Sequence, residues 1–171
     1  NLVGVIPATE NMPGGSATKP GDIVTSMSGQ TVEILNTDAE GRLILCDALT
    51  EADSESPDLL IDCATLTGAA RIALGPELQS LYCDDDAVAD GLLKAGTQVA
   101  DPLWRMPLWR PYRKQIEGKC ADLNNVAKGT FAGSIIAALY LAEFVSAKTR
   151  WAHLDIMASN PAGRPGRPAP C

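Results

Sequence analysis

Two carboxylates and an arginine lie close together in the segment 36–43, between an apolar strand and an apolar helix. Asp38 and Glu40 are two positions apart, and side chains at this spacing on an extended segment point the same way. Two convergent carboxylates suit a divalent metal ion, and one carboxylate can bridge a pair of ions. Arg42 would close such a site from the start of the helix. The spacing is therefore compatible with a metal-dependent catalytic site.

The same segment has a purely structural interpretation. Thr37 and Glu40 match the Ser/Thr-x-x-Glu capping box, in which two side chains satisfy the free backbone N–H groups at the start of a helix. Capping boxes are far commoner than metal sites. The spacing alone therefore favours the cap.

A second candidate site follows the next predicted strand. The loop 65–68 lies just past a strand that ends near Ala64, and it precedes a helix. Free N–H groups at a helix start can bind an anion or a substrate carbonyl, and Gly68 would allow close backbone approach. Ligands of open α/β sheets collect at the carboxyl ends of strands, so this loop and the segment 36–43 could line one crevice. A plain connection whose glycine eases a turn is the alternative.

His153 is the single histidine of the chain. It lies in an alternating apolar segment that predicts a strand over 151–156. No Gly-x-Ser-x-Gly sequence accompanies it, so a serine hydrolase triad is disfavoured. We expect a structural histidine, hydrogen-bonded to Asp155 on the same face of the strand.

Bulk composition limits the possible partners. The chain has 171 residues, of which 46% are hydrophobic, enough for one domain with a real core. Its net charge is −7 with scattered Lys and Arg, which argues against nucleic-acid binding. No apolar run approaches a membrane span, and the start does not look like a signal peptide. Five cysteines without a C-x-x-C pair predict a reduced, cytoplasmic protein without a thiolate zinc site.

Strand and helix patterns alternate along the chain. Apolar runs predict strands at 2–6, 22–27, 31–35, 58–64, 78–83 and 151–156. Helical spacing predicts a helix at 42–52, and further helices are expected after Gly68 up to about Leu74, on the surface at 86–99, and in the apolar segment 130–146. Proline and glycine predict a loop over 8–21, an irregular aromatic connection near 102–112, and a loose end at 160–171. The pattern predicts one α/β domain over 1–171, with a mixed, largely parallel sheet covered by helices on both faces.

The segment 36–43 resembles the signature of the leucyl (cytosol) aminopeptidase family. Further blocks follow in the order that the family shows: Glu10-Asn11-Met12-Pro13, Lys19-Pro20-Gly21-Asp22, Met27-Ser28-Gly29-Gln30-Thr31-Val32-Glu33, Ala64-Thr65-Leu66-Thr67-Gly68-Ala69 and Trp151-Ala152-His153-Leu154-Asp155. The resemblance covers nearly the whole chain, and is weakest at 76–120 and after Ile156.

This resemblance implies a two-metal aminopeptidase that removes a leucine-type N-terminal residue from peptides. Asp38 would ligate one divalent ion and Glu40 would bridge both, with manganese or zinc as the expected metals. Arg42 would be catalytic, holding a bicarbonate or the developing oxyanion. The loop residues implied in substrate binding are Thr65, Leu66 and Gly68.

In that family the remaining metal ligands and a catalytic lysine lie upstream of the position of Asn1. We therefore expect an incomplete catalytic domain that is inactive alone, from an enzyme that acts on peptides with a free N-terminus and assembles as a homohexamer. Two other function classes stay open at this point: a non-catalytic α/β module that binds a small anion, and an assembly module that has lost its chemistry.

Overall fold

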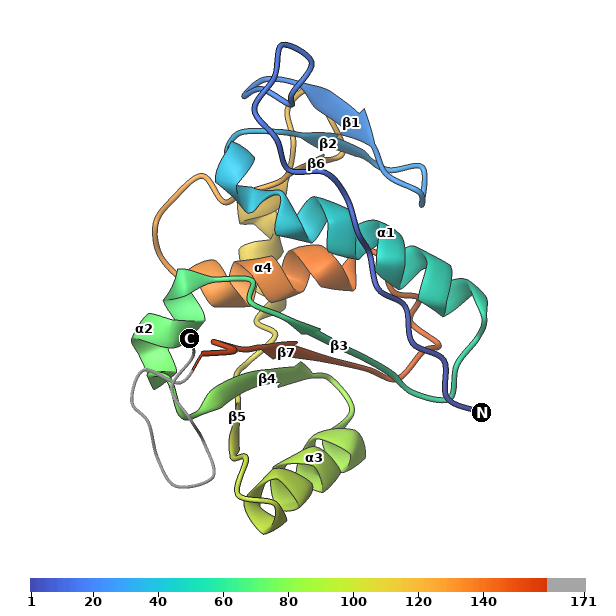
Figure 1. The fold of residues 1–171 in the computed structure, drawn as a ribbon, viewed down its shortest axis with the longest axis vertical. Coiled ribbons are helices and arrows are strands. Elements are labelled where there is room, and N and C mark those ends of the chain that lie inside the picture. The colour runs from blue at the N-terminus through green and yellow to red at the C-terminus, as the bar shows by residue number, and fades with distance from the viewer. Residues whose placement is uncertain (160–171) are drawn as a thin grey trace.

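The computed structural model describes residues 1–159, and its larger sheet has four strands in the order β3-β7-β4-β5 (Figure 1). Their bounds are β3 (Leu60–Ala64), β4 (Gln79–Cys83), β5 (Leu103–Arg105) and β7 (Trp151–Asp155). β3 runs parallel to β7, β4 runs parallel to β5, and β4 is antiparallel to β7. The sheet is therefore mixed, and the carboxyl ends of β3 and β7 lie at the same edge.

A smaller three-stranded sheet packs above the helices, in the order β1-β2-β6. β1 (Ile23–Thr25) and β2 (Thr31–Glu33) form the predicted hairpin, and β6 (Leu123–Asn124) is parallel to β2. Gly29 has a φ of 86° in the turn, a conformation that glycine adopts without strain. The turn predicted between the two strands is confirmed.

Helices cover both faces of the larger sheet. α1 (Gly41–Ser54) and α4 (Gly133–Ala142) lie together on one side in Figure 1, and α3 (Asp86–Gln98) packs on β4 and β5 from the other. The short α2 (Gly68–Leu74) contacts β4 and α4 at one end of the sheet. The predicted α/β class, with helices on both faces, is confirmed.

The main core lies between α1, α4 and the two sheets. Seven of the ten residues of α4 are buried, because its sequence is apolar on every side and other elements surround it. Tyr140 of α4 and Leu49 of α1 both belong to this core. A second cluster, around Leu81 and Ala89, fills the space between α3 and the sheet.

Three predicted elements differ in the structure, and one strand was not predicted. The apolar run 2–6 is an exposed coil rather than a buried strand, with Leu2 99% accessible, because no strand among residues 1–159 pairs with it. The helix predicted over 130–146 begins only at Gly133, since Ala132 has the left-handed φ of 57°. The connection near 102–112 contains β5 and part of the 3-10 helix η2 (Arg110–Ile116). The two-residue β6 has no pattern in the sequence.

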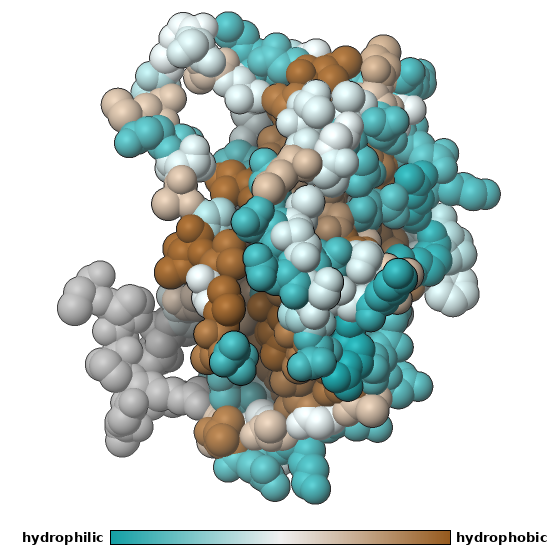
Figure 2. All heavy atoms as spheres, turned by 90° about the vertical axis from the view of Figure 1, so that its right-hand side faces the viewer, coloured by the Kyte–Doolittle hydropathy of each residue, from teal (hydrophilic) through white to brown (hydrophobic). Residues whose placement is uncertain are grey.

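Large hydrophobic side chains stay exposed along the N-terminal run and on the edge of the sheet at β3. Figure 2 shows hydrophobic residues gathered on part of the face that carries the N-terminus. Within residues 1–159 no helix is long and apolar enough to cross a membrane. The predicted loose end, 160–171, lies outside the described residues.

Two glycines of α3 provide a matched stability test. A methyl group on Gly96 would lie 2.5 Å from the backbone oxygen of Asp101, whereas one on Gly91 would meet open space. We expect Gly96→Ala to lower the free energy of unfolding by about 1–3 kcal/mol through overpacking. Gly91→Ala should raise it by roughly 0.5–1 kcal/mol through helix propensity.

Urea unfolding of both variants measures the difference. Equal changes in the two variants would show that the turn after α3 does not pack as closely as the structure describes.

Candidate active site

The segment that carries the two carboxylates is helical rather than extended. Residues Thr37–Ala39 form the 3-10 helix η1, and Glu40 has helical backbone angles at the start of α1. The argument that residues two positions apart point the same way therefore does not apply here. The capping box is also absent, because Asn36 accepts the hydrogen bond from the Asp38 amide and Glu40 makes no capping bond.

A buried asparagine holds this segment against the smaller sheet. Asn125 follows β6 and is fully buried. Its side-chain oxygen accepts hydrogen bonds from the amides of Leu35 and Asn36, at 2.8 and 3.3 Å. Its side-chain nitrogen donates to the Asn36 carbonyl at 2.6 Å. Sequence reasoning missed Asn125, because the pairing joins positions about 90 residues apart and leaves no local pattern.

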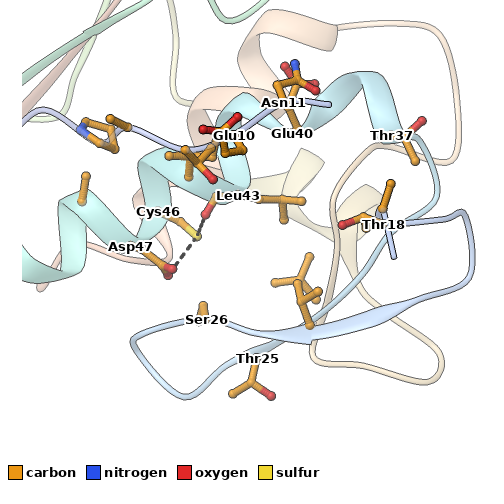
Figure 3. Close-up of a pocket in the computed structure, with 18 of the residues that line it drawn as sticks. Glu10, Asn11, Thr18, Thr25, Ser26, Thr37, Glu40, Leu43, Cys46 and Asp47 are labelled. Atoms are coloured by element: carbon orange, nitrogen blue, oxygen red, sulfur yellow. Dashed lines mark hydrogen bonds between the residues drawn. The ribbon is translucent and has the colours of Figure 1, made fainter. Parts of the chain in front are cut away.

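Asp38 and Glu40 are exposed, and their carboxylates have no hydrogen-bond or ion-pair partner among residues 1–159. Glu40 lines an open pocket of about 960 Å³, together with Glu10, Asn11 and Asp47 (Figure 3). In the part of the chain that the structure describes, no group of three or more His, Cys, Asp or Glu could hold a metal ion. The roles of Asp38 and Glu40 as ligands stay a prediction.

Arg42 lies in the first turn of α1 and is only 8% accessible. Its guanidinium lies 5.9 Å from the ring centre of Tyr140, within range of a cation–π contact. Its Nε is buried and has no acceptor, and the guanidinium donates no hydrogen bond to any residue in 1–159. Burial lowers the pKa of Arg42, and the nearby Tyr140 and Asp155 counteract that shift. Buried donors are normally satisfied, so this group has capacity for a ligand oxygen.

The 65–68 loop packs against the start of the same helix. A methyl group added to Gly41 would lie 3.8 Å from Cδ1 of Leu66, in ordinary contact. Thr65 and Gly68 are exposed, and Leu66 is half-buried. The loop and the Arg42 turn are therefore neighbours, although β2 and β3, which precede them, belong to different sheets.

A buried carboxylate occupies two of the four amides of this loop. Asp155, the last residue of β7, accepts hydrogen bonds from the amides of Leu66 and Thr67, each at 3.1 Å. The Thr67 hydroxyl accepts a bond from the Ala70 amide and so caps α2. The negative charge of Asp155 therefore already occupies the Leu66 and Thr67 amides, which an anion would need as donors. The geometry thus disfavours the small-anion module.

His153 is fully buried, and its partner differs from the predicted one. Its Nδ1 lies 2.6 Å from an oxygen of Asp62, not Asp155. The parallel register of β3 and β7 places Asp62 directly beside His153, which a single strand pattern cannot show. Trp151 donates to the same carboxylate at 2.8 Å, and its ring stacks on the imidazole.

Known proteins are similar to this chain over almost its whole length. The model of the cytosol aminopeptidase family, catalytic domain, matches residues 1–168. A probable cytosol aminopeptidase of Aromatoleum aromaticum is 55% identical over 99% of this chain and 35% of its own length. A relative of the same description from Saccharophagus degradans is 56% identical over 91% of the chain and 31% of its length.

Solved structures agree with the sequence comparisons. The cytosol aminopeptidase of Coxiella burnetii superposes with a TM-score of 0.89 and 51% identity, over 94% of this chain and 35% of that one. A mutant of tomato leucine aminopeptidase superposes with a TM-score of 0.87 and 39% sequence identity, over 95% of this chain and 32% of that one. The chain thus spans about a third of the length of these relatives. It belongs to the cytosol aminopeptidase family, whose catalytic domain it matches from residue 1 to residue 168.

Proposed function

We propose that this chain supplies part of the active site of a metal-dependent aminopeptidase that removes a leucine-type N-terminal residue from peptides. The site lies where the start of α1 meets the 65–68 loop. The observation that carries the proposal is Arg42, a buried guanidinium without an acceptor, next to that loop in a chain of this family.

The donor chemistry of the segment fits divalent metal ions. Asp38 and Glu40 offer carboxylate oxygens that no other described residue uses. They would hold the ions, one as a ligand of a single ion and the other as the bridge, with manganese or zinc as the metal. When bound, the ions would supply an activated water and polarise the peptide carbonyl. The further ligands would come from parts of the full-length enzyme that correspond to regions of the relatives outside the segment matched by this chain.

The chain's own residues would stabilise charge and orient the substrate. Arg42 would donate hydrogen bonds to a bound bicarbonate or to the oxyanion that develops on the scissile carbonyl. Its position on the Tyr140 ring fixes the guanidinium before substrate binds, so little reorganisation is needed during the reaction. Thr65, Leu66 and Gly68 would contact the substrate backbone, with Gly68 leaving room for close approach.

Family membership also supports proposals about location and assembly. We propose that the enzyme acts in the cytoplasm on peptides with a free N-terminus. We also propose that it works as a homohexamer and that Arg42 binds bicarbonate.

The first prediction concerns Glu40 in an enzyme of the relatives' full length. Residues 1–171 replace the matching segment of the Aromatoleum aromaticum relative, and we call this protein the chimaera. Glu40→Ala should abolish nearly all hydrolysis of a leucyl chromogenic substrate, because a bridging ligand holds both ions. Glu51→Ala, an exposed glutamate of the same helix, is the matched control and should keep full activity. Equal activity of the two variants would refute the bridging role.

The second prediction concerns Arg42 in the same chimaera. Arg42→Ala should retain bound metal, measured by elemental analysis, but lower kcat by about two orders of magnitude through the lost oxyanion donor. Arg71→Ala removes an exposed arginine from α2, just beyond the loop, and should behave like the parent. A loss of metal together with the loss of turnover would mean that Arg42 supports the ligands rather than the oxyanion.

The third prediction concerns the 171 residues alone. Since Asp38 and Glu40 are only part of a two-metal ligand set, this chain should bind manganese weakly in isothermal titration. It should show no turnover of the leucyl substrate in excess manganese. Chelator-resistant turnover in a contaminant-free preparation would contradict this, because the residues needed for hydrolysis would then lie within the chain.

A further inference from the structure

We propose that Asp155 is a positioning residue that fixes the backbone of the 65–68 loop for substrate binding. From the sequence, Asp155 was expected only as the hydrogen-bond partner of His153 in a strand. The inference rests on the proposed function, because it assumes that this loop contacts substrate. It concerns how the fold presents the loop, and it assigns Asp155 no contact with substrate or metal.

The carboxylate of Asp155 is almost wholly committed to the loop. It is 2% accessible and lies at the carboxyl end of the strand that borders β3. One oxygen accepts from the amides of Leu66 and Thr67, each at 3.1 Å. The other lies 2.5 Å from the Thr67 hydroxyl, which donates to it while accepting from the Ala70 amide. Three bonds from two adjacent residues leave the backbone here little freedom.

A second set of buried groups holds the carboxylate itself in place. Ser134, in the first turn of α4, donates to the same oxygen as Thr67 at 3.0 Å. Tyr82 of β4 donates to the Ser134 hydroxyl at 2.6 Å. The Ser80 hydroxyl donates to the backbone oxygen of Asp155 at 3.0 Å. The anchor is thus built from β4, β7 and α4, which are rigid elements of the core.

The direction of the amides fixes the direction of the carbonyls. In a trans peptide the N–H of one residue and the C=O of the preceding residue point to opposite sides. Because the amides of Leu66 and Thr67 face Asp155, the carbonyls of Thr65 and Leu66 must point away from it. Those two carbonyls could accept hydrogen bonds from substrate N–H groups.

Amide hydrogen exchange in the 171-residue chain tests the anchor without any need for activity. Asp155→Ala should remove the protection of the Leu66 and Thr67 amides from exchange. Asp155→Asn keeps an acceptor oxygen and should restore much of it. Ser54→Ala is the control, because this exposed serine of α1 bonds only the Glu51 carbonyl of its own helix, and its loss should leave the protection of both amides unchanged. Unchanged protection of both amides in Asp155→Ala would overturn the proposal.

Kinetics of the chimaera test the consequence for substrate. Asp155→Ala should lower kcat/KM by roughly 100-fold, the scale expected for displaced substrate contacts. It should also raise KM. A merely structural role would lower the amount of folded enzyme and leave KM unchanged. Asp155→Asn should recover KM in part, and an unchanged KM in Asp155→Ala would refute the positioning role.

If Asp155→Ala does not fold, Thr67 carries the same test. Thr67→Val removes the hydroxyl that bonds the carboxylate, whereas Thr67→Ser keeps it. We expect a raised KM in the first variant and a parental KM in the second; equal KM values would refute the positioning role. A wild-type chimaera without aminopeptidase activity would refute the proposed function, and the exchange experiment would still decide the anchor.

Discussion

A carboxylate enclosed by protein must receive hydrogen bonds from its surroundings, since an unsatisfied buried charge is strongly destabilising. Asp155 meets this requirement with donors from the 65–68 loop and from α4. The loop cannot shift without removing those donors, and α4 cannot shift without removing Ser134. The arrangement of β7, the loop and α4 is therefore set by one electrostatic constraint. The candidate active site is built along the edge that this constraint fixes.

The start of α1, on the other side of the candidate site, is positioned by α4 through Tyr140. Tyr140 in that helix provides the ring beneath the Arg42 guanidinium, and α1 packs against α4. A cation that lies on an aromatic ring and lacks an acceptor retains its full capacity to donate to a ligand. Arg42 is thereby held in place without being neutralised. This is the property that an oxyanion-stabilising group requires.

The sequence predicted the local elements well and the long-range pairings poorly. Helical spacing located α1, α2 and α3, and turn residues located the β1–β2 hairpin, because each signal lies within a few residues. The β6 strand and the Asn125 anchor were missed. Both depend on a partner about 90 residues away, which no local pattern encodes.

In the candidate site, too, local segments were predicted better than their long-range contacts. The segment 36–43 and the 65–68 loop could be identified from motif resemblance, and the loop does lie against the first turn of α1. The expected extended geometry of Asp38 and Glu40 was wrong, because a 3-10 turn leads into the helix. The predicted partner of His153 was wrong because strand register, not sequence proximity, decides which carboxylate lies nearest.

The separation between β3 and β7 also sets the order in which the protein can assemble. Leu60 pairs with Trp151, and nearly the whole described chain lies between them or precedes them. Contacts of such high sequence separation form late and slow the folding of a domain. On the ribosome, the 65–68 loop emerges long before the residue that anchors it. The loop would therefore stay unordered until β7 has been synthesised, so that this edge of the sheet takes shape only after the strands on either side of it are present.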